Sequence, residues 1–311
     1  MSTFISVIVP LYNEELVIHE LYKKLTAVLH RYKDEYEIIL INDGSRDKTL
    51  QLAKQLCFQD KKVKLINFSR NFGHQAALTA GMDKTSGRVV VTIDADLQDP
   101  PEIIPEMVKQ WGEGYQVVHG VRKKRKGEGI FRHAAIFLFY RFLRKTTHID
   151  ITVDSGDFRL MDRRVVDELK KMREKNRYIR GMVSWVGFRQ TEVEYVREKR
   201  FAGKTKYPFR KLVKLAIDGI LSFSSFPLKI SLAIGYFCSL VSLLIILYAV
   251  ISNYPYPEPT IPGWIFVFLI VLFLGGIQLI TIGILGQYIG RIYEQTNERP
   301  IYIMEEHINF E

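Results

Sequence analysis

Cysteine is scarce in this sequence, and the N-terminus has no basic leader. Cys57 and Cys238 are the two cysteines among 311 residues, and they lie far apart in the chain. Two such distant cysteines exclude a disulfide framework and do not make a metal site. Met1–Phe4 lacks the basic and apolar regions of a secretory signal, and a strand pattern follows it directly. We therefore expect neither a disulfide-rich fold nor a cleavable signal peptide.

Charged residues are missing from two long stretches in the last third of the chain. None occurs in 230–257 or in 259–290, and Glu258 alone separates the two stretches. Each is longer than the roughly 20 apolar residues that cross a bilayer as a helix. We therefore predict two transmembrane helices, Leu228–Ser252 and Trp264–Tyr288. The alternative, a hairpin buried in a soluble core, does not suit uncharged runs of this length.

Basic residues flank the outer ends of the predicted spans, whereas the connector between the spans has none. Asn253–Gly263 contains four prolines and no lysine or arginine, while Lys199–Lys214 and Arg291 lie beyond the outer ends. By the positive-inside rule, the large N-terminal region and the C-terminal tail are both cytoplasmic. The pattern thus predicts an integral, multi-pass protein of a bacterial inner or plasma membrane.

The predicted organisation has three parts. Residues 1–226 form a cytoplasmic domain with juxtamembrane helices, residues 227–290 form the transmembrane hairpin, and residues 291–311 form a cytoplasmic tail. Small residues in the second span, among them Gly283 and Gly286, would let the helices pack against other protomers, so a homo-oligomer is compatible with the sequence.

Short β-branched runs recur at regular spacing along the first part of the chain. The five runs are Ile5–Val9, Glu37–Ile41, Val63–Phe68, Val89–Ile93 and Gln116–His119. Helical patterns lie between them: an apolar face recurs through Glu14–Tyr32, and Ser45, Gly73 and Pro101 are suited to begin the next three helices. This alternation predicts an α/β fold with βαβ units on a parallel sheet, covered by helices on both faces.

Two segments carry most of the positive charge. His119–Thr147 holds nine lysines and arginines against one glutamate, and Arg197–Lys214 holds eight against one. Phe131–Lys145 and Pro208–Phe226 are predicted amphipathic helices at a membrane interface, although a core-packing helix with a basic solvated face is the alternative. Such segments bind nucleic acid, an acidic membrane or an anionic substrate. The neighbouring spans favour a lipid phosphate, and we expect no nucleic acid partner.

The pair Asp94 and Asp96 closes the predicted strand Val89–Ile93. Residues two apart on a strand point to the same side, and the carboxyl ends of parallel strands are where open α/β sheets bind ligands. Two adjacent carboxylates suit a hard divalent cation bridging to a diphosphate, with Gln98 as a neutral oxygen donor. The alternative is a solvated acidic turn before Pro100.

Polar clusters also follow the first two predicted strands. Asp43 either accepts hydrogen bonds from a base or a sugar, or it belongs to a turn in which Gly44 has a positive φ. Glu14 either contacts a ligand or interacts with the first turn of a helix. His74 has no second histidine or cysteine at ligand spacing, so we do not expect a zinc site there.

Four motifs together resemble those of the inverting family 2 glycosyltransferases. They are Ile8–Glu14, Asn42–Ser45, Asp94–Pro101 and Ser155–Leu160. With the two predicted spans, the chain is similar to the polyprenyl-phosphate glycosyltransferases, the group of the dolichol-phosphate mannose synthases and bactoprenol glucosyltransferases. The resemblance covers nearly the whole chain. It implies a GT-A (Rossmann-like) catalytic domain, a nucleotide diphosphate sugar as donor, a membrane polyprenyl phosphate as acceptor and Mg²⁺ or Mn²⁺ as cofactor.

The resemblance also implies roles for individual residues. Those expected to hold the nucleotide are Pro10, Tyr12, Glu14 and Asp43. Those expected to hold the sugar diphosphate and the metal are Asp94, Asp96 and Gln98. Those expected to bind phosphates at the catalytic centre are Arg122, Arg132 and Arg200.

Asp157 has no single implied role in catalysis. Some members of the family carry serine at this position, and a phosphate monoester, with a second pKa of about 6, is already a nucleophile at pH 7. Asp157 is therefore open to four roles: general base, orientation of the acceptor, contact with sugar hydroxyls, or support of the metal.

The predicted activity is the inverting transfer of a single hexose, glucose from UDP-glucose, to polyprenyl phosphate. Mannose from GDP-mannose and an amino-arabinose derivative are the alternative donors. A protein of a different class, a non-catalytic membrane-anchored nucleotide-sugar binder, would keep the donor motifs but tolerate loss of Arg122, Arg132 and Arg200. A processive polysaccharide synthase is disfavoured, because its Gln-x-x-Arg-Trp acceptor motif is absent.

Overall fold

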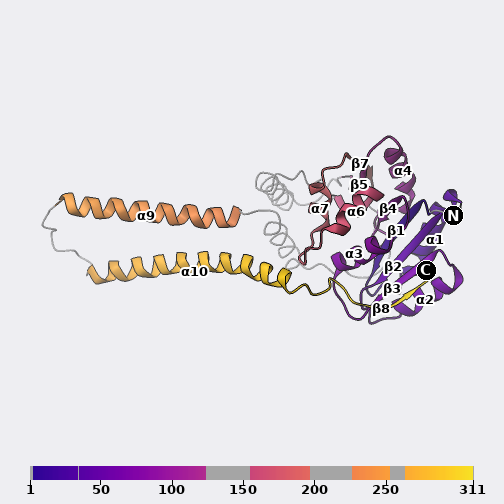
Figure 1. Ribbon diagram of the computed structural model, residues 1–311, viewed down its shortest axis with the longest axis horizontal. Coiled ribbons are helices and arrows are strands. Elements are labelled where there is room, and N and C mark those ends of the chain that lie inside the picture. Colours follow the sequence, from indigo (N-terminus) through magenta and orange to yellow (C-terminus); the bar gives the residue numbers. More distant parts are fainter. Residues whose placement is uncertain (1–2, 34, 124–154, 197–225, 253–262, 311) are drawn as a thin grey trace. The chain divides into compact units, whose positions relative to one another are not determined.

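A computed structural model describes residues 3–33, 35–123, 155–196, 226–252 and 263–310. The chain divides into two compact units (Figure 1). One comprises Met1–Gly219 together with Pro300–Glu311, and the other is Ile220–Arg299. The predicted interfacial helices Phe131–Lys145 and Pro208–Phe226 lie, apart from Phe226, outside the described residues.

In the described residues, the first unit is built on one mixed sheet of eight strands. In chain order the strands are β1 (Ile5–Leu11), β2 (Tyr36–Asn42), β3 (Val63–Phe68), β4 (Val89–Thr92), β5 (Val117–Arg122), β6 (Ser155–Asp162), β7 (Gln190–Tyr195) and β8 (Met304–Ile308). Their order across the sheet is β7-β5-β6-β4-β1-β2-β3-β8. The strands β1 to β4 are parallel, whereas β6 runs antiparallel to β4 and β5, and β8 runs antiparallel to β3.

Helices pack against both faces of this sheet. They are α1 (Ile18–Leu29), α2 (Thr49–Gln59), α3 (His74–Lys84), α4 (Ile104–Gly112), α6 (Arg163–Lys171) and α7 (Ile179–Trp185), with 3₁₀ turns at His30–Tyr32 and Pro101–Ile103. Successive strand residues point to opposite faces, so each central strand supplies side chains to two cores. This explains why the central strands β1, β2 and β4 are mainly apolar.

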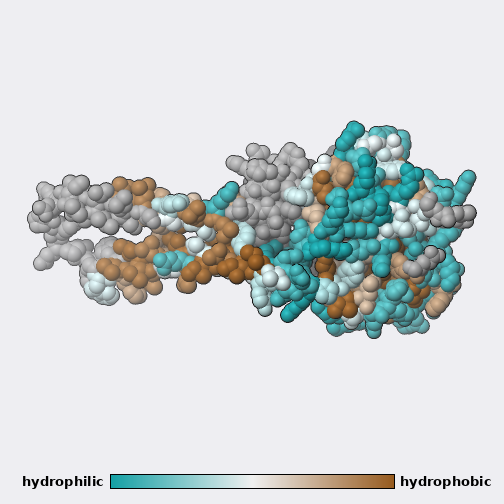
Figure 2. All heavy atoms as spheres, in the orientation of Figure 1, coloured by the Kyte–Doolittle hydropathy of each residue, from teal (hydrophilic) through white to brown (hydrophobic). Residues whose placement is uncertain are grey.

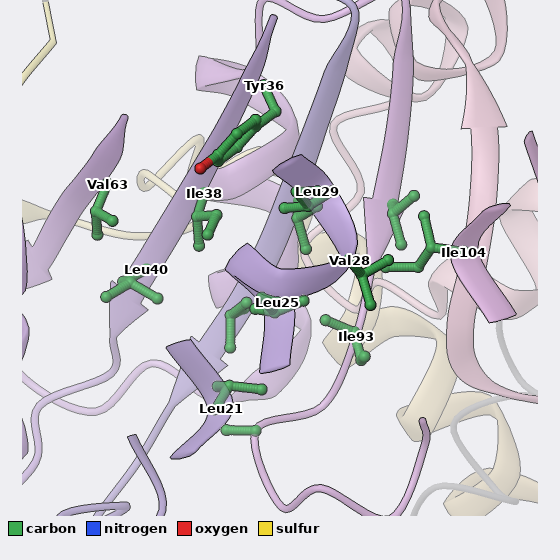
Figure 3. Close-up of a cluster of buried hydrophobic side chains, with 14 of the residues drawn as sticks. Leu21, Leu25, Val28, Leu29, Tyr36, Ile38, Leu40, Val63, Ile93 and Ile104 are labelled. Carbon is green, nitrogen blue, oxygen red and sulfur yellow. The ribbon is translucent and has the colours of Figure 1, made fainter. Parts of the chain in front are cut away.

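The larger core lies between the sheet and the helices α1, α2 and α4. Figure 3 shows Leu21, Leu25 and Leu29 of α1 facing Ile38 and Leu40 of β2, and all five are almost completely buried. The three leucines repeat at four-residue spacing, which places them on one side of the helix. The helical pattern recognised in the sequence thus forms the main packing face of the unit.

The α/β class is confirmed, but the expectation of a purely parallel sheet is wrong. All five predicted strands are present, yet β6, which had not been predicted, inserts antiparallel between β4 and β5.

Ser45 does not begin α2 as predicted. That helix begins at Thr49, and the Ser45 hydroxyl accepts a hydrogen bond from the Asn13 backbone N–H. Gly73 does precede α3 as predicted, with a φ of 99°.

The second unit contains the helices α9 (Phe226–Ser252) and α10 (Gly263–Thr296). Figure 2 shows apolar side chains exposed along the described part of α10. Within the described residues, one stretch, Ile270–Thr296, is long and apolar enough to cross a membrane, and the apolar stretch Phe226–Cys238 is shorter than a span. The predicted pair of spans is therefore not confirmed.

We predict that Gly81→Ala destabilises the first unit by about 1–3 kcal/mol, because the new methyl group overpacks the interface between α3 and the sheet. A Cβ at Gly81 would lie 2.4 Å from Cγ2 of Ile8 and 3.2 Å from Cδ1 of Ile41. Thermal unfolding of the purified protein measures the change. The matched control is Gly112→Ala, because a Cβ on this α4 residue meets nothing within 4 Å. Equal melting temperatures for both variants would contradict the prediction.

Candidate active site

The direction of the strands brings polar side chains together at one edge of the sheet. The parallel strands β1 to β4 end at this edge. Since β6 runs antiparallel to β4, it begins there, and β5 and β7, which are parallel to each other and opposite to β6, end there. The residues that follow Leu11, Asn42 and Thr92 therefore lie at the same edge as Asp157 and Arg122.

The loops after β1 and β2 are tied directly to each other. The Asn13 backbone N–H donates to Oγ of Ser45 at 2.9 Å, and the Arg46 backbone N–H donates to Oδ1 of Asn13 at 2.8 Å. The Glu14 backbone N–H donates to Oγ1 of Thr49 at 2.7 Å. Asn13 has a φ of 52°, which lets its side chain reach the second loop. These bonds fix the segment that carries Tyr12 and Glu14.

The side chain of Asp43 accepts hydrogen bonds from the loop that follows β3. Its Oδ1 accepts from the backbone N–H of Phe72 at 2.7 Å, and its Oδ2 accepts from Nδ2 of Asn71 at 2.9 Å and from the Gly73 backbone at 3.0 Å. Burial raises the pKa of Asp43, although the bonds from Phe72 and Gly73 oppose that shift. The carboxylate thus holds residues 69–73 in place.

Gly44 is required next to Asp43 for two reasons. Its φ is 65°, in the left-handed region, and a Cβ there would lie 2.5 Å from the backbone nitrogen of Asn71. The loop 69–73 therefore lies directly on Gly44. The motif Asn42–Ser45, singled out in the sequence, accordingly serves the contact between two loops.

The acidic turn after β4 has a bent backbone. Leu97 has a φ of 58°, yet its side chain is almost completely buried. A buried branched residue in this conformation is strained and persists only where packing holds it. The Gln98 backbone N–H donates to Oδ1 of Asp96 at 3.2 Å. The turn thereby presents Asp94 and Asp96 beyond the end of the strand.

Asp157 is the centre of a buried ionic cluster. Arg180, on α7, donates to both of its oxygens at 3.0 Å, and Nη2 of Arg159 donates to Oδ1 at 3.2 Å. Nε2 of His74 lies 3.1 Å from Oδ2 of Asp157 and 3.8 Å from Oδ1 of Asp94. Burial alone would raise the pKa of Asp157, but Arg180 and His74 hold it well below its usual range. A carboxylate in this state is a poor general base.

The same cluster shifts the pKa values of His74 and Asp94. Burial lowers the pKa of His74, but the hydrogen bond to Asp157 and the charge of Asp94 outweigh it, so the net shift is upward. Burial and the neighbouring carboxylates of Asp157, Asp99 and Asp96 raise the pKa of Asp94 to about 6. A nearby cation would stabilise the ionised form of a carboxylate in such surroundings.

Arg122 belongs to a second polar cluster at the same edge. Its Nη2 lies 3.4 Å from Oδ1 of Asp99, and its Nε donates to the Tyr195 hydroxyl at 3.2 Å. The Tyr195 hydroxyl donates to the same Asp99 oxygen. A Cβ at Gly156 would lie 2.9 Å from Nη2 of Arg122, so the glycine before Asp157 gives the guanidinium its room. Arg122 is thereby oriented by its neighbours.

The structure brings most of the predicted site residues to this edge, among them Pro10, Tyr12, Glu14, Asp43, Asp94, Asp96, Gln98, Arg122 and Asp157. Arg132 and Arg200 lie outside the described residues. His74, Arg180 and Tyr195 also belong to these clusters, and none of them was predicted as a site residue. His74 had been considered as a zinc ligand alone, and its actual partner Asp157 is 83 positions away in the sequence.

The acidic turn after β4 offers part of the oxygen ligands that a hard divalent cation needs. Among the residues that the structure describes, no group of three histidine, cysteine or acidic side chains could hold a metal. Asp94 and Asp96 nevertheless offer two carboxylates on one turn, and the side chain of Asp94 is 34% exposed. Such an incomplete set suits Mg²⁺ or Mn²⁺, which take substrate phosphates as further ligands.

Comparisons with known proteins identify the family. The profile of Glycosyl transferase family 2 matches residues 6–170. The chain is 50% identical over 309 residues to an uncharacterised glycosyltransferase of Bacillus subtilis strain 168, covering 98% of this chain and 94% of that protein. The chain belongs to glycosyltransferase family 2.

The chain is also similar to proteins whose names state a glucosyl transfer or a glucosyl product. The bactoprenol glucosyl transferase of Shigella phage SfX is 41% identical over 301 residues, which covers 97% of this chain and 98% of that protein. Among solved structures, the glucosyl-3-phosphoglycerate synthase of Mycobacterium tuberculosis has a TM-score of 0.47 at 19% identity, covering 70% of this chain and 78% of that one. Together with the family assignment, the mixed α/β sheet confirms the predicted fold class in its coarse form, a GT-A (Rossmann-like) glycosyltransferase domain.

We predict that Asp157→Asn lowers the pKa of His74 to or below its ordinary value of about 6.5, because the substitution removes the negative charge bonded to the ring. An NMR titration of the histidine ring carbons measures this pKa. The control is Asp167→Asn on α6, an acidic residue that is ion-paired with Arg163 and Lys170. It should leave the His74 titration unchanged. An unaltered His74 titration in folded Asp157→Asn protein would contradict the described cluster.

Proposed function

We propose that this glycosyltransferase transfers glucose from UDP-glucose to a membrane polyprenyl phosphate with inversion at the anomeric carbon. The observation that carries the proposal is the 40–41% identity, along nearly the whole chain, to proteins named bactoprenol glucosyl transferase. Those proteins act, by their names, on bactoprenol and with glucose. This similarity supports glucose as the sugar and a polyprenyl phosphate as the acceptor.

The donor would bind at the edge of the sheet described above. We assign the nucleotide to the ends of β1 and β2, where Pro10, Tyr12 and Glu14 stand. Tyr12 is 36% exposed, and its ring offers a surface on which a base can stack. Asp43 would act mainly through the loop 69–73, since its oxygens already accept four hydrogen bonds from Asn71, Phe72 and Gly73.

The chemistry follows from the charge states of the two substrates. A phosphate oxygen of the acceptor attacks the anomeric carbon in line; the new C–O bond forms as the bond to the nucleoside diphosphate breaks. A dianionic phosphate needs alignment and charge neutralisation more than it needs a base. The strongly lowered pKa of Asp157 supports an orienting role for this residue, through Arg180 and His74.

A divalent cation would complete the donor site. Asp94 and Asp96, with Gln98, are the residues that would hold Mg²⁺ or Mn²⁺, which would supply positive charge to the departing diphosphate. Asp94 has a raised pKa, which supports the assignment because a cation beside it would relieve the crowding of carboxylates.

We assign the acceptor phosphate to the basic residues Arg122, Arg132 and Arg200. A guanidinium binds phosphate with two parallel hydrogen bonds, which makes arginine suited to this task. The membrane would be reached through the basic segments and two spans, with residues 1–226 and the tail 291–311 on the cytoplasmic side. The apolar stretch Ile270–Thr296 supports one of the two spans.

The function is tested with radiolabelled UDP-glucose, GDP-mannose and a UDP-linked amino-arabinose, each offered with undecaprenyl phosphate. We expect label in the lipid fraction with UDP-glucose, and none without the lipid phosphate. Binding of a nucleotide sugar without transfer to any polyprenyl phosphate would instead identify a non-catalytic binding protein.

We predict that Asp96→Ala lowers divalent-dependent transfer by about 100-fold or more, because one carboxylate alone does not hold the metal against a diphosphate. Initial rates with added Mn²⁺ and with EDTA measure the effect. The control is Asp167→Ala, an acidic residue on α6, which should keep the wild-type rate. Full activity of folded Asp96→Ala protein would contradict the metal assignment.

We predict that a cysteine replacing Thr260, in a variant without Cys57 and Cys238, reacts with an impermeant thiol reagent from the outer side alone. The positive-inside rule places the proline-rich connector on that side. Labelling of intact cells and of inverted vesicles distinguishes the two sides. Labelling from the cytoplasmic side alone would contradict the two-span topology.

A further inference from the structure

Strand β8 brings the residues before it to the same edge of the sheet as the candidate site. It runs antiparallel to β3, and its first residue, Met304, pairs with Phe68, the last residue of β3. The Ser69 backbone N–H donates to the carbonyl oxygen of Ile303 at 3.1 Å. The segment 302–305 therefore contacts the beginning of the loop 69–73, which leads directly into His74.

An aromatic stack connects this segment to the loop. The Tyr302 ring stacks on Phe68, with ring centres 5.2 Å apart and an angle of 17° between the planes. Phe68 meets Phe72 edge to face at 5.6 Å, and the Arg70 guanidinium lies 4.1 Å from the centre of the Phe72 ring. Phe72 is the residue whose backbone N–H donates to Asp43. Tyr302 thus contacts, through the Phe68 ring, the loop residue whose backbone is bound to Asp43.

Tyr302 is itself fixed by its hydroxyl group. The hydroxyl donates to Oδ2 of Asp83, on α3, at 2.8 Å. Arg173 donates to both oxygens of the same carboxylate at 2.9 and 3.0 Å. A ring that is held at its hydroxyl end and stacked on its face has little freedom to move. It therefore restricts the positions of Phe68 and of the loop.

A β-bulge adds a second line of support. Asn67 pairs with Glu306 and Phe68 pairs with Met304, so Glu305 is an extra residue that the bulge turns aside. Its Oε2 accepts from Nδ2 of Asn67 at 3.0 Å, and Oδ1 of Asn67 accepts from Nδ2 of Asn42 at 2.8 Å. Asn42 directly precedes Asp43.

We propose that Tyr302, a residue located after the long apolar helix in the chain, is a positioning residue for donor binding. It holds the loop 69–73 so that Asp43 and His74 keep the geometry of the donor site. Tyr302 touches no reacting atom and acts through the Phe68 and Phe72 rings. The inference rests on the proposed function, because it takes this edge of the sheet as the site of the nucleotide sugar.

The test compares Tyr302→Leu with Tyr302→Phe in the full-length protein. The leucine variant loses the stacked ring, whereas the phenylalanine variant keeps the ring and loses the bond to Asp83. We expect Tyr302→Leu to raise KM for the nucleotide sugar about tenfold. We expect kcat and KM for polyprenyl phosphate to change less than about twofold, and Tyr302→Phe to restore most of the donor KM.

Asn309→Ala is the matched control in the same segment. Nδ2 of Asn309 donates to the carbonyl oxygens of Cys57 and Val63 at 2.8 and 2.7 Å, at the other end of β8. This variant loosens β8 without touching the aromatic stack. We expect a lower melting temperature with an unchanged donor KM.

Hydrogen exchange gives a readout that needs no substrate. The amides of Phe72 and Gly73 are protected by Asp43, so we expect faster exchange across residues 69–73 in Tyr302→Leu and not in Asn309→Ala. Should Tyr302→Leu fail to fold, Tyr302→Met, which is apolar without a ring, replaces it in both measurements.

Two results would overturn the inference. One is wild-type exchange of residues 69–73 with a donor KM within twofold of wild type in the leucine or methionine variant. The other is an equal rise in donor KM for that variant and Asn309→Ala. If the wild-type protein transfers no sugar, the proposed function fails, and the exchange measurement still decides whether Tyr302 positions the loop.

Discussion

The alternation of strand direction is the constraint on which the candidate site depends. Four parallel strands end at one edge, and β6 and β8 begin at that edge because they run the other way. Asp94 and Asp157 therefore approach the same histidine, although their strands point in opposite directions. A parallel β6 would place Asp157 at the far edge of the sheet. The reversal of one strand is thus what makes a cluster of acidic and basic groups out of residues that are distant in sequence.

The buried ionic cluster explains how this edge keeps its shape. Asp157 is buried together with Arg159 and near Arg180, and an isolated charge in such a place would cost several kcal/mol. Pairing with two guanidiniums and His74 offsets that cost only in one geometry, since Arg180 needs both carboxylate oxygens at once. The cluster therefore fixes α7 and the first turn of α3 relative to β6. A site prepared in this way aligns its substrates without reorganising during the reaction.

Sequence patterns predicted the parts of the fold that depend on local periodicity. The run Val89–Ile93 is apolar apart from Thr92, so its burial on both faces could be inferred, and the motif ending at Pro101 marked the acidic turn. The strands β7 and β8 were missed because Gln190–Tyr195 and Met304–Ile308 are rich in glutamate and lie at sheet edges. β7 does alternate polar residues with Thr191, Val193 and the buried Tyr195, but an alternation this short does not by itself distinguish a strand from a loop. The partners of His74 were missed for a related reason, since no local pattern encodes a contact across 83 positions.

The short motifs of this chain serve the contacts between loops as much as they serve chemistry. Gly44 allows the backbone at Asn71 to lie on the β2 loop, and Gly156 leaves room for Arg122. Asp43, beside Gly44, binds the backbone of the loop 69–73 that the glycine lets approach. The Arg122 guanidinium beside Gly156 is instead held by Asp99 and Tyr195, while Asp157 binds Arg159 and Arg180. The pair Asp43 and Gly44 needs both residues, because a larger side chain at Gly44 would displace the loop that the carboxylate holds. The glycines at positions 44 and 156 therefore have a packing cause that is independent of the substrate.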